Sequence, residues 1–119
     1  MTTGWVNGGL VDPDAPSISA LDHGLTVGDG VFETLKVVGG QPFALTRHLN
    51  RLERSAAGMG LLRPDRVEVA EACRAGVAAT DATGVNRLRI TYTAGKGPLG
   101  SDRTDATPTL TVAASPAPV

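Results

Sequence analysis

The 119-residue sequence predicts an α+β fold, in which an antiparallel sheet carries two helices packed on one face. Apolar and polar residues alternate over residues 31–38 and again over 85–93, which is typical of strands with one buried face. Leucine and alanine recur at helical spacing over residues 45–59 between these two segments. Near the N-terminus, Asn7-Gly8 is the favoured pair for a tight hairpin turn.

Composition limits both the size of the fold and the kinds of partner. A chain of this length with 41% hydrophobic residues suffices for one domain with its own core. The net charge is −1 and the basic residues form no run, so we expect no nucleic-acid partner. Apolar runs are too short for a membrane span, and the single cysteine, Cys73, suits a reducing compartment, so we expect a cytoplasmic protein. Two histidines and one cysteine are too few for a structural zinc site, so we expect no metal.

The first half of the chain contains the clearest elements. We expect a hairpin over residues 5–11, a break at the prolines that follow, and a short strand over 17–21. The strand over 31–38 directs Val31, Glu33, Leu35 and Val37 to one face, and Phe32, Thr34 and Lys36 to the other. Gly39 and Gly40 then turn the chain into the first helix.

The second half is predicted to contain one helix and two strands. The helix starts at residues 63–65 with Pro64 in its first turn. Its apolar stripe includes Val67, Cys73 and Val77, it runs to about residue 80, and Gly84 closes it. The strand over 85–93 buries Leu88, Ile90 and Tyr92 and pairs with Leu110, Val112 and Ala114. The long Gly- and Pro-rich connection between these strands is of the kind that is often functional.

Two motifs identify a resemblance to a known family. GDGVFET (residues 28–34) and RHLNRLERSA (residues 47–56), separated by a turn, resemble the small-domain signature of fold-type IV pyridoxal-phosphate enzymes. This group includes branched-chain aminotransferases, D-amino-acid aminotransferases and 4-amino-4-deoxychorismate lyases. The resemblance implies pyridoxal 5′-phosphate as the cofactor, an N-terminal small domain over residues 1–114 and the start of an interdomain linker at 115–119. The family's large domain, with its Schiff-base lysine, is absent, so we expect no catalytic residue here and no activity from this chain alone.

Arg51 is the candidate cofactor-binding residue. From composition alone it is an exposed helix arginine paired with Glu53 or Asp65. The resemblance instead implies that it holds the cofactor phosphate, a role that suits the planar, permanently charged guanidinium. His48 lies three residues earlier, and it either shapes the phosphate end of the pocket or satisfies a backbone carbonyl.

Phe32 and Arg89 are the candidate substrate-binding residues. Without the resemblance, the simplest interpretations are that Phe32 contacts the core and that Arg89 lies at an exposed edge of the sheet. The resemblance places Phe32 in the wall of the substrate site, where D-amino-acid aminotransferases usually carry tyrosine, and places Arg89 at a basic position that faces the substrate. That branch also has an arginine and a histidine where this chain has Leu99 and Ser101.

Three functions remain open at this point. Residues 28–37 and 87–102 are most similar to aminodeoxychorismate lyase, which removes pyruvate from 4-amino-4-deoxychorismate to give 4-aminobenzoate for folate synthesis. A branched-chain or D-amino-acid aminotransferase is the first alternative. A non-catalytic module that binds a phosphate-bearing ligand or a partner protein is the second. The family resemblance also implies a homodimer that acts on a small-molecule substrate.

Overall fold

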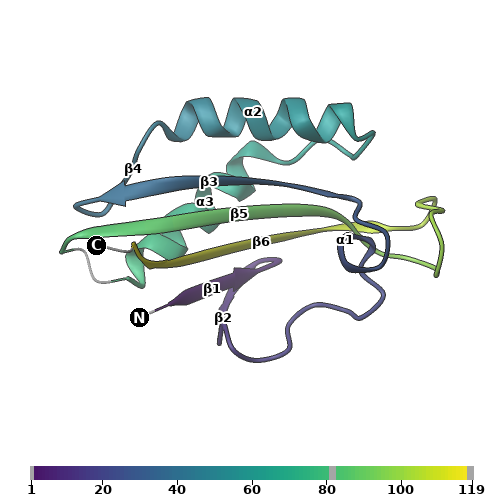
Figure 1. Ribbon diagram of the computed structural model, residues 1–119, viewed down its shortest axis with the longest axis horizontal. Helices are drawn as coiled ribbons and strands as arrows, with labels where there is room; N and C mark the ends of the chain where they lie inside the picture. The colour runs from purple at the N-terminus through teal and green to yellow at the C-terminus, as the bar shows by residue number, and fades with distance from the viewer. Residues whose placement is uncertain (1, 81–82, 118–119) are drawn as a thin grey trace.

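The computed structural model describes residues 2–80 and 83–117, and within them it shows one curled antiparallel sheet with the two longer helices on one face (Figure 1). The strands are β1 (Thr3–Val6), β2 (Gly9–Val11), β3 (Gly30–Val38), β4 (Gln41–Pro42), β5 (Val85–Lys96) and β6 (Thr107–Pro116). They lie in the order β2-β1-β6-β5-β3-β4. The helices are α1 (His23–Thr26), α2 (Leu45–Gly58) and α3 (Arg66–Ala78). The predicted α+β class is confirmed.

A single apolar core lies between the sheet and the two longer helices. Figure 1 shows α2 running along β3 and α3 crossing behind the sheet. The buried residues of the sheet include Leu35, Val37, Leu88, Ile90, Leu110 and Val112, and those of the helices include Leu49, Leu52, Ala56, Val69, Ala72, Cys73 and Val77. Since all of these side chains form one cluster, α2 and α3 cover the same face and leave the other face open.

Strand β3 has a strand partner along the whole of one edge but along only part of the other. It pairs with β5 along its whole length, from Gly30 opposite Thr93 to Val38 opposite Val85. Within the described residues it pairs with β4 only at Val37 and Val38. The edge of β3 over residues 30–36 therefore has no strand partner on the side that faces away from β5.

The N-terminal segment is partly as predicted. β1 and β2 form the expected hairpin, and both turn residues, Asn7 and Gly8, have positive φ, as a type I′ turn requires. The predicted strand over residues 17–21 is wrong, because this segment is irregular and exposed. It leads into α1, where the Asp22 side chain accepts a hydrogen bond from the Gly24 amide and caps the helix.

Helix α3 ends near residue 80 and buries Cys73 and Val77 as predicted, but it differs from its prediction in its start, its closing residue and the position of Val67. Asp65 is the N-cap and accepts from two amides of the first turn, so Pro64 precedes the helix instead of lying within it. Val67 is 68% exposed, whereas Val69 is buried. The helix ends with Ala79 as its C-cap, and Gly84 lies just before β5, so Gly84 is not its closing residue.

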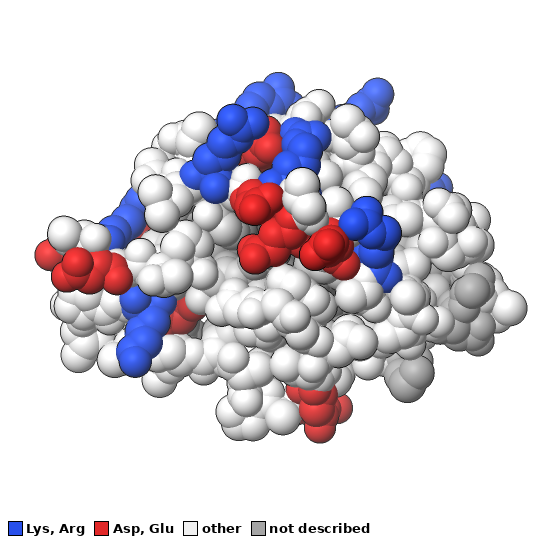
Figure 2. Space-filling model, turned by 180° about the vertical axis from the view of Figure 1, so that it is seen from behind, with Lys and Arg blue, Asp and Glu red and all other residues white. Residues whose placement is uncertain are grey.

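The surface carries charges of both signs. On the side drawn in Figure 2, basic and acidic side chains lie next to one another, with uncharged surface between the groups. Glu53, for example, pairs with Arg66 at 3.1 Å and with Arg63 at 3.6 Å. No helix among the described residues has the length and apolar character needed to cross a bilayer.

Candidate cofactor site

Glu33 is a buried acidic residue beneath the first long helix. The alternation of β3 places it on the same face as Leu35 and Val37, and its side chain is only 4% exposed. A carboxylate removed from water in this way needs compensating partners. Glu33 must therefore be stabilised by neighbouring groups that donate hydrogen bonds or carry positive charge.

Helix α2 supplies both partners of Glu33. His48 Nδ1 lies 2.6 Å from Glu33 Oε1. Arg51 Nε donates to both carboxylate oxygens at 3.0 Å, and Arg51 Nη2 lies 2.9 Å from Oε1. Residues three apart on a helix project from neighbouring positions on one side, so α2 presents both groups to the same carboxylate.

The ionisation of Glu33 follows from these contacts. Burial raises the pKa of the carboxyl group, but hydrogen bonds and charge attraction from Arg51 and His48 outweigh burial, and the pKa lies below its usual value of 4.5. The same hydrogen bond and charge attraction raise the pKa of Arg51. Glu33 is therefore an anion at neutral pH. Because an anionic carboxylate only accepts, the His48 proton that faces it must lie on Nδ1.

Arg51 keeps donors available for a further ligand. A guanidinium has five N–H donors, and the contacts with Glu33 use the Nε donor and one on Nη2, which leaves three. The side chain is 58% exposed. The outer edge of the guanidinium is thus a charged, two-pronged donor of the kind that binds phosphate or carboxylate oxygens. Arg51 fits the phosphate of pyridoxal phosphate on these grounds.

Phe32 and Arg89 meet on the open face of the sheet. The guanidinium carbon of Arg89 lies 3.7 Å from the centroid of the Phe32 ring, and Arg89 Nη1 donates to Thr34 Oγ1 at 3.4 Å. Phe32 is 55% exposed, so it is not a core contact. It borders a depression of about 330 Å³ whose lining is largely apolar and includes Ile18, Leu25, Val31, Thr91 and Thr93.

The three predicted site residues therefore lie on two faces of the sheet. Phe32 and Arg89 are together on the open face, while Arg51 lies on the helix side with Glu33. Phe32 and Glu33 are consecutive residues of β3, on the stretch whose edge is free.

The partners that composition alone suggests for Arg51, and one alternative for His48, are wrong. Glu53 pairs with Arg66 and Arg63, and Asp65 caps α3, so neither binds Arg51. His48 contacts the Glu33 carboxylate through Nδ1 and not a backbone carbonyl. Arg54, which is exposed on the same helix, makes no hydrogen bond or ion pair with another described residue.

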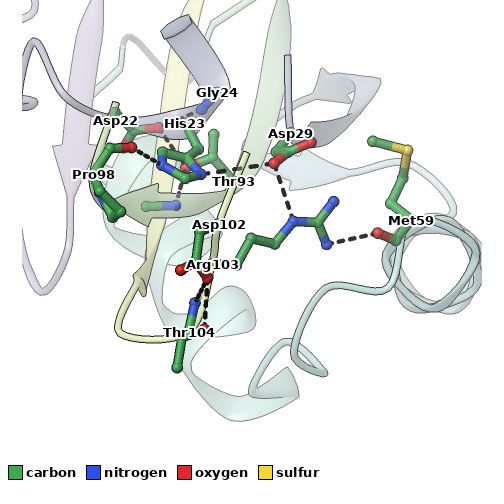
Figure 3. Close-up of polar contacts among 11 residues, drawn as sticks. Asp22, His23, Gly24, Asp29, Met59, Thr93, Pro98, Asp102, Arg103 and Thr104 are labelled. Carbon is green, nitrogen blue, oxygen red and sulfur yellow. Dashed lines mark hydrogen bonds and ion pairs between the residues drawn. The ribbon is translucent and has the colours of Figure 1, made fainter. Parts of the chain in front are cut away.

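A second polar cluster, which sequence reasoning missed, holds the loop of residues 97–106 (Figure 3). His23, fully buried, donates from Nε2 to the Pro98 carbonyl at 2.7 Å. Arg103 binds Asp29 Oδ2 through Nε at 3.0 Å and the Met59 carbonyl through Nη1 at 2.8 Å. The loop is thus attached at its start and near its end. The antiparallel pairing of the two predicted strands, which brings Asp29 beside Ala94, was the signal that could have located this cluster.

Two other features carry no cofactor chemistry. Across residues 2–80 and 83–117, no group of three or more His, Cys, Asp and Glu side chains is arranged to hold a metal ion. A depression of about 580 Å³ lies between α2 and the segment that follows it, and its lining includes Arg47, Arg54 and Leu61. It does not include Arg51, Phe32 or Arg89.

The fold and the site define a class: an α+β domain in which an exposed arginine pairs with a buried glutamate of a strand whose edge is partly free. The sequence model of the family described as amino-transferase class IV matches residues 30–119. The chain belongs to that family.

Proteins similar to this chain carry different names. The bifunctional aminodeoxychorismate lyase / D-amino acid transaminase of Mycobacterium tuberculosis is 36% identical, over 95% of this chain and 38% of its own length. A Methanocaldococcus jannaschii protein, provisionally named as a branched-chain-amino-acid aminotransferase, is 34% identical over 96% of this chain and 40% of its own length. A solved structure of a hypothetical aminotransferase from Mycobacterium tuberculosis in its PLP-bound form has a TM-score of 0.85 and 31% identity, over 99% of this chain and 41% of that one. The chain thus spans about two fifths of the length of these relatives.

Proposed function

We propose that this chain is the small domain of a pyridoxal-phosphate-dependent enzyme and that Arg51 binds the cofactor phosphate. The observation that carries the proposal is the exposed guanidinium of Arg51, fixed by Glu33 on one side and left with three free donors on the other. The PLP-bound relative with the same fold supports the choice of cofactor. In this proposal the domain ends with β6 at residue 116, two residues later than the sequence indicates, and a linker to the part that carries the reactive lysine follows it.

The open face supplies the substrate contacts in this proposal. When bound, pyridoxal phosphate supplies an electron sink for carbanion chemistry at the carbon next to the substrate amine. Phe32 forms an apolar wall, and Arg89, stacked on its ring, keeps in-plane N–H groups for a substrate carboxylate. Neither residue moves a proton in the reaction. Their roles are to exclude water and to orient the substrate.

Within the family, we favour 4-amino-4-deoxychorismate lyase. The similarity of residues 28–37 and 87–102 to that branch supports this choice, and so does the name of the Mycobacterium tuberculosis relative. Phe32 lacks the hydroxyl that the D-amino-acid branch usually carries at this position, and Leu99 and Ser101 replace its arginine and histidine.

An aminotransferase is the second candidate, because the names of two relatives include that activity. Both candidates act on amino compounds that bear a carboxylate, so the contacts of Phe32 and Arg89 serve either. In both cases we propose a homodimer, which light scattering of the purified protein would test.

Cofactor binding tests the first level of the proposal. The polypeptide encoded by the complete source reading frame would be purified as wild type, as Arg51→Ala and as Arg54→Ala. We expect the Arg51→Ala variant to bind pyridoxal phosphate more weakly while binding of pyridoxal, which lacks the phosphate, changes little. Arg54→Ala is the matched control, since Arg54 is an exposed arginine on the same helix. Equal affinity of the wild type and Arg51→Ala for pyridoxal phosphate would contradict the proposal.

Product analysis tests the second level. The wild-type protein loaded with pyridoxal phosphate would be given 4-amino-4-deoxychorismate, and pyruvate and 4-aminobenzoate would be measured. We expect both products in equal amounts. Transamination of branched-chain or D-amino acids with no 4-aminobenzoate formed would overturn the lyase choice and establish the aminotransferase.

A further inference from the structure

We propose that Glu33 is a positioning residue of the phosphate site, which sets the orientation of the Arg51 guanidinium before the phosphate arrives. This inference rests on the proposed function of Arg51. It assigns a functional role to a buried acid for which the sequence alone indicates only a position on the core-facing side of its strand. It also predicts that removing this negative charge weakens the binding of an anion.

The geometry of the pair fixes the guanidinium in its plane. Arg51 Nε lies 3.0 Å from both carboxylate oxygens of Glu33, and Arg51 Nη2 lies 2.9 Å from Oε1. These contacts occupy one edge of the planar group. Rotation of the guanidinium away from this plane would break all of them, so the edge formed by Nη1 and the second Nη2 donor is held facing outward.

Glu33 itself is anchored from a second direction. His48 Nδ1 contacts Oε1 at 2.6 Å, and the carboxylate lies in the core-facing row of β3 with 4% exposure. His48 is 17% exposed, so it too is largely held by the fold. The carboxylate is therefore a fixed support, unlike the exposed partners of a typical surface ion pair.

Two effects of Glu33 on a bound phosphate oppose each other. Its negative charge lowers the attraction between Arg51 and an anion, whereas its contacts remove the freedom of a long side chain that would otherwise be lost on binding. The charge effect predicts tighter phosphate binding when Glu33 is neutralised, and the positioning effect predicts weaker binding. Because Arg51 is 58% exposed and its charge is screened by water, we expect the positioning effect to be the larger one.

The test compares two ligands that differ only in the phosphate. The full-length polypeptide would be prepared as wild type, Glu33→Gln, Arg51→Ala and Glu53→Gln. Glu53→Gln is the matched control, since Glu53 also pairs with arginines, Arg66 and Arg63, but lies away from Arg51. The ratio of affinities for pyridoxal phosphate and pyridoxal would be measured by equilibrium dialysis. The ³¹P chemical shift of the bound phosphate would be recorded as a spectroscopic readout that fold stability alone does not move.

We expect Glu33→Gln to lower the affinity ratio roughly 10-fold, which is the size of effect typical when a residue that orients a binding group, without touching the bound species, is removed. We also expect it to shift the ³¹P signal, whereas Glu53→Gln changes neither. An unchanged or higher ratio in Glu33→Gln, while Arg51→Ala still lowers it, would overturn the inference and leave the proposed function standing. An unchanged ratio in Arg51→Ala would overturn both.

A second variant covers the case in which Glu33→Gln fails to fold. His48→Ala removes one anchor of the carboxylate and leaves the pair of Glu33 and Arg51 in place. We expect a smaller fall of the same affinity ratio, with partial rescue in His48→Asn, whose side-chain amide still donates to Glu33. A folded His48→Ala protein with the wild-type ratio would count against positioning.

Discussion

The Arg89 guanidinium carbon lies 3.7 Å from the centroid of the Phe32 ring, on the sheet face that α2 and α3 leave open. The two residues belong to neighbouring strands and lie in diagonal positions, since Phe32 pairs with Thr91 and Thr34 pairs with Arg89. Side chains of this length reach each other across such a diagonal. The pair is a structural contact whose strength can be measured independently of any ligand.

The stacking of Arg89 on Phe32 is expected to contribute a small coupling energy. In a double-mutant cycle with Phe32→Ala and Arg89→Ala, we expect the coupling free energy to be about 0.5–1 kcal/mol, the range for exposed cation–π contacts. Urea denaturation of the four proteins would measure it. A cycle of Lys36→Ala and Arg89→Ala serves as the control, because Lys36 stacks on Phe43 and not on Phe32. Strict additivity in the first cycle would show that the stacking contributes nothing.

The lowered pKa of Glu33 predicts a specific acid sensitivity. A carboxyl group whose pKa is lower in the folded than in the unfolded state stabilises the fold above the unfolded value, 4.5, and this contribution is lost as the pH falls through the folded value. Wild type is therefore expected to lose stability more steeply below pH 4.5 than Glu33→Gln. Chemical denaturation at a series of pH values would show the two curves converging in acid. Parallel curves would mean that Glu33 does not titrate in this way.

Leu52 is a test of the core between α2 and the sheet. It is 1% exposed, so Leu52→Ala removes buried methyl groups and leaves a cavity, at an expected cost of about 2–5 kcal/mol in the free energy of unfolding. Leu62→Ala, at a residue 66% exposed, is expected to stay within about 0.5 kcal/mol of wild type. Thermal unfolding followed by circular dichroism compares the two. Similar melting temperatures for both variants would contradict the assigned packing.

Gly95 tests the irregularity where β5 leaves its register with β6. It has a φ of +90°, and a Cβ there would overlap the Thr107 carbonyl of β6. Gly39 has a φ of +57° but nothing within 4 Å of its Cβ position. Both alanine variants bear the left-handed backbone cost of about 1–2 kcal/mol, and only Gly95→Ala must also displace a neighbouring strand. We therefore expect Gly95→Ala to be clearly the less stable of the two in denaturant. Equal stabilities would mean that the bulge is not as tight as described.

Cys73 is expected to be chemically inert in the folded protein. Burial raises the pKa of its thiol to about 12, in spite of the nearby charge of Arg74. Since the thiolate is the reactive form, labelling by a thiol reagent at pH 8 should be very slow until denaturant is added. The colour released by a chromogenic disulfide reagent measures this directly. Rapid labelling of the native protein would show that α3 opens readily.

The elements that could be predicted are those in which apolar residues recur at a regular spacing along the sequence. The alternation in β3 and β5 and the leucines of α2 were sufficient to place both strands, the helix and the shared core face. Helix α3 was predicted less well because its buried side is built from small residues such as Ala72 and Gly76. A stripe through Val67 is as apolar in sequence as the true one, and only the contact with the sheet distinguishes them.

The partners in the site could not be predicted from local spacing. Alternation placed Glu33 correctly on the buried face, but its partners lie 15 and 18 residues away, on a helix whose crossing angle no sequence period determines. Composition alone therefore suggests only acids near Arg51 in sequence, Glu53 and Asp65, as its partners. The second polar cluster, which holds the loop of residues 97–106, was missed for the same reason, since His23 and Pro98 are 75 residues apart.

The free edge of β3 has a consequence for how copies of the chain behave together. Residues 30–36 include Val31, Phe32 and Leu35 and, among the described residues, have no strand partner on that side, and an edge of this kind is a template on which another chain can add a strand. Glu33 points inward from that edge, and Lys36 interrupts the apolar run from the other face. Inward-facing charges of this kind are among the devices by which sheet proteins discourage edge-to-edge joining. Glu33 therefore has a second effect: besides contacting Arg51, its inward-facing charge discourages the addition of another strand to β3.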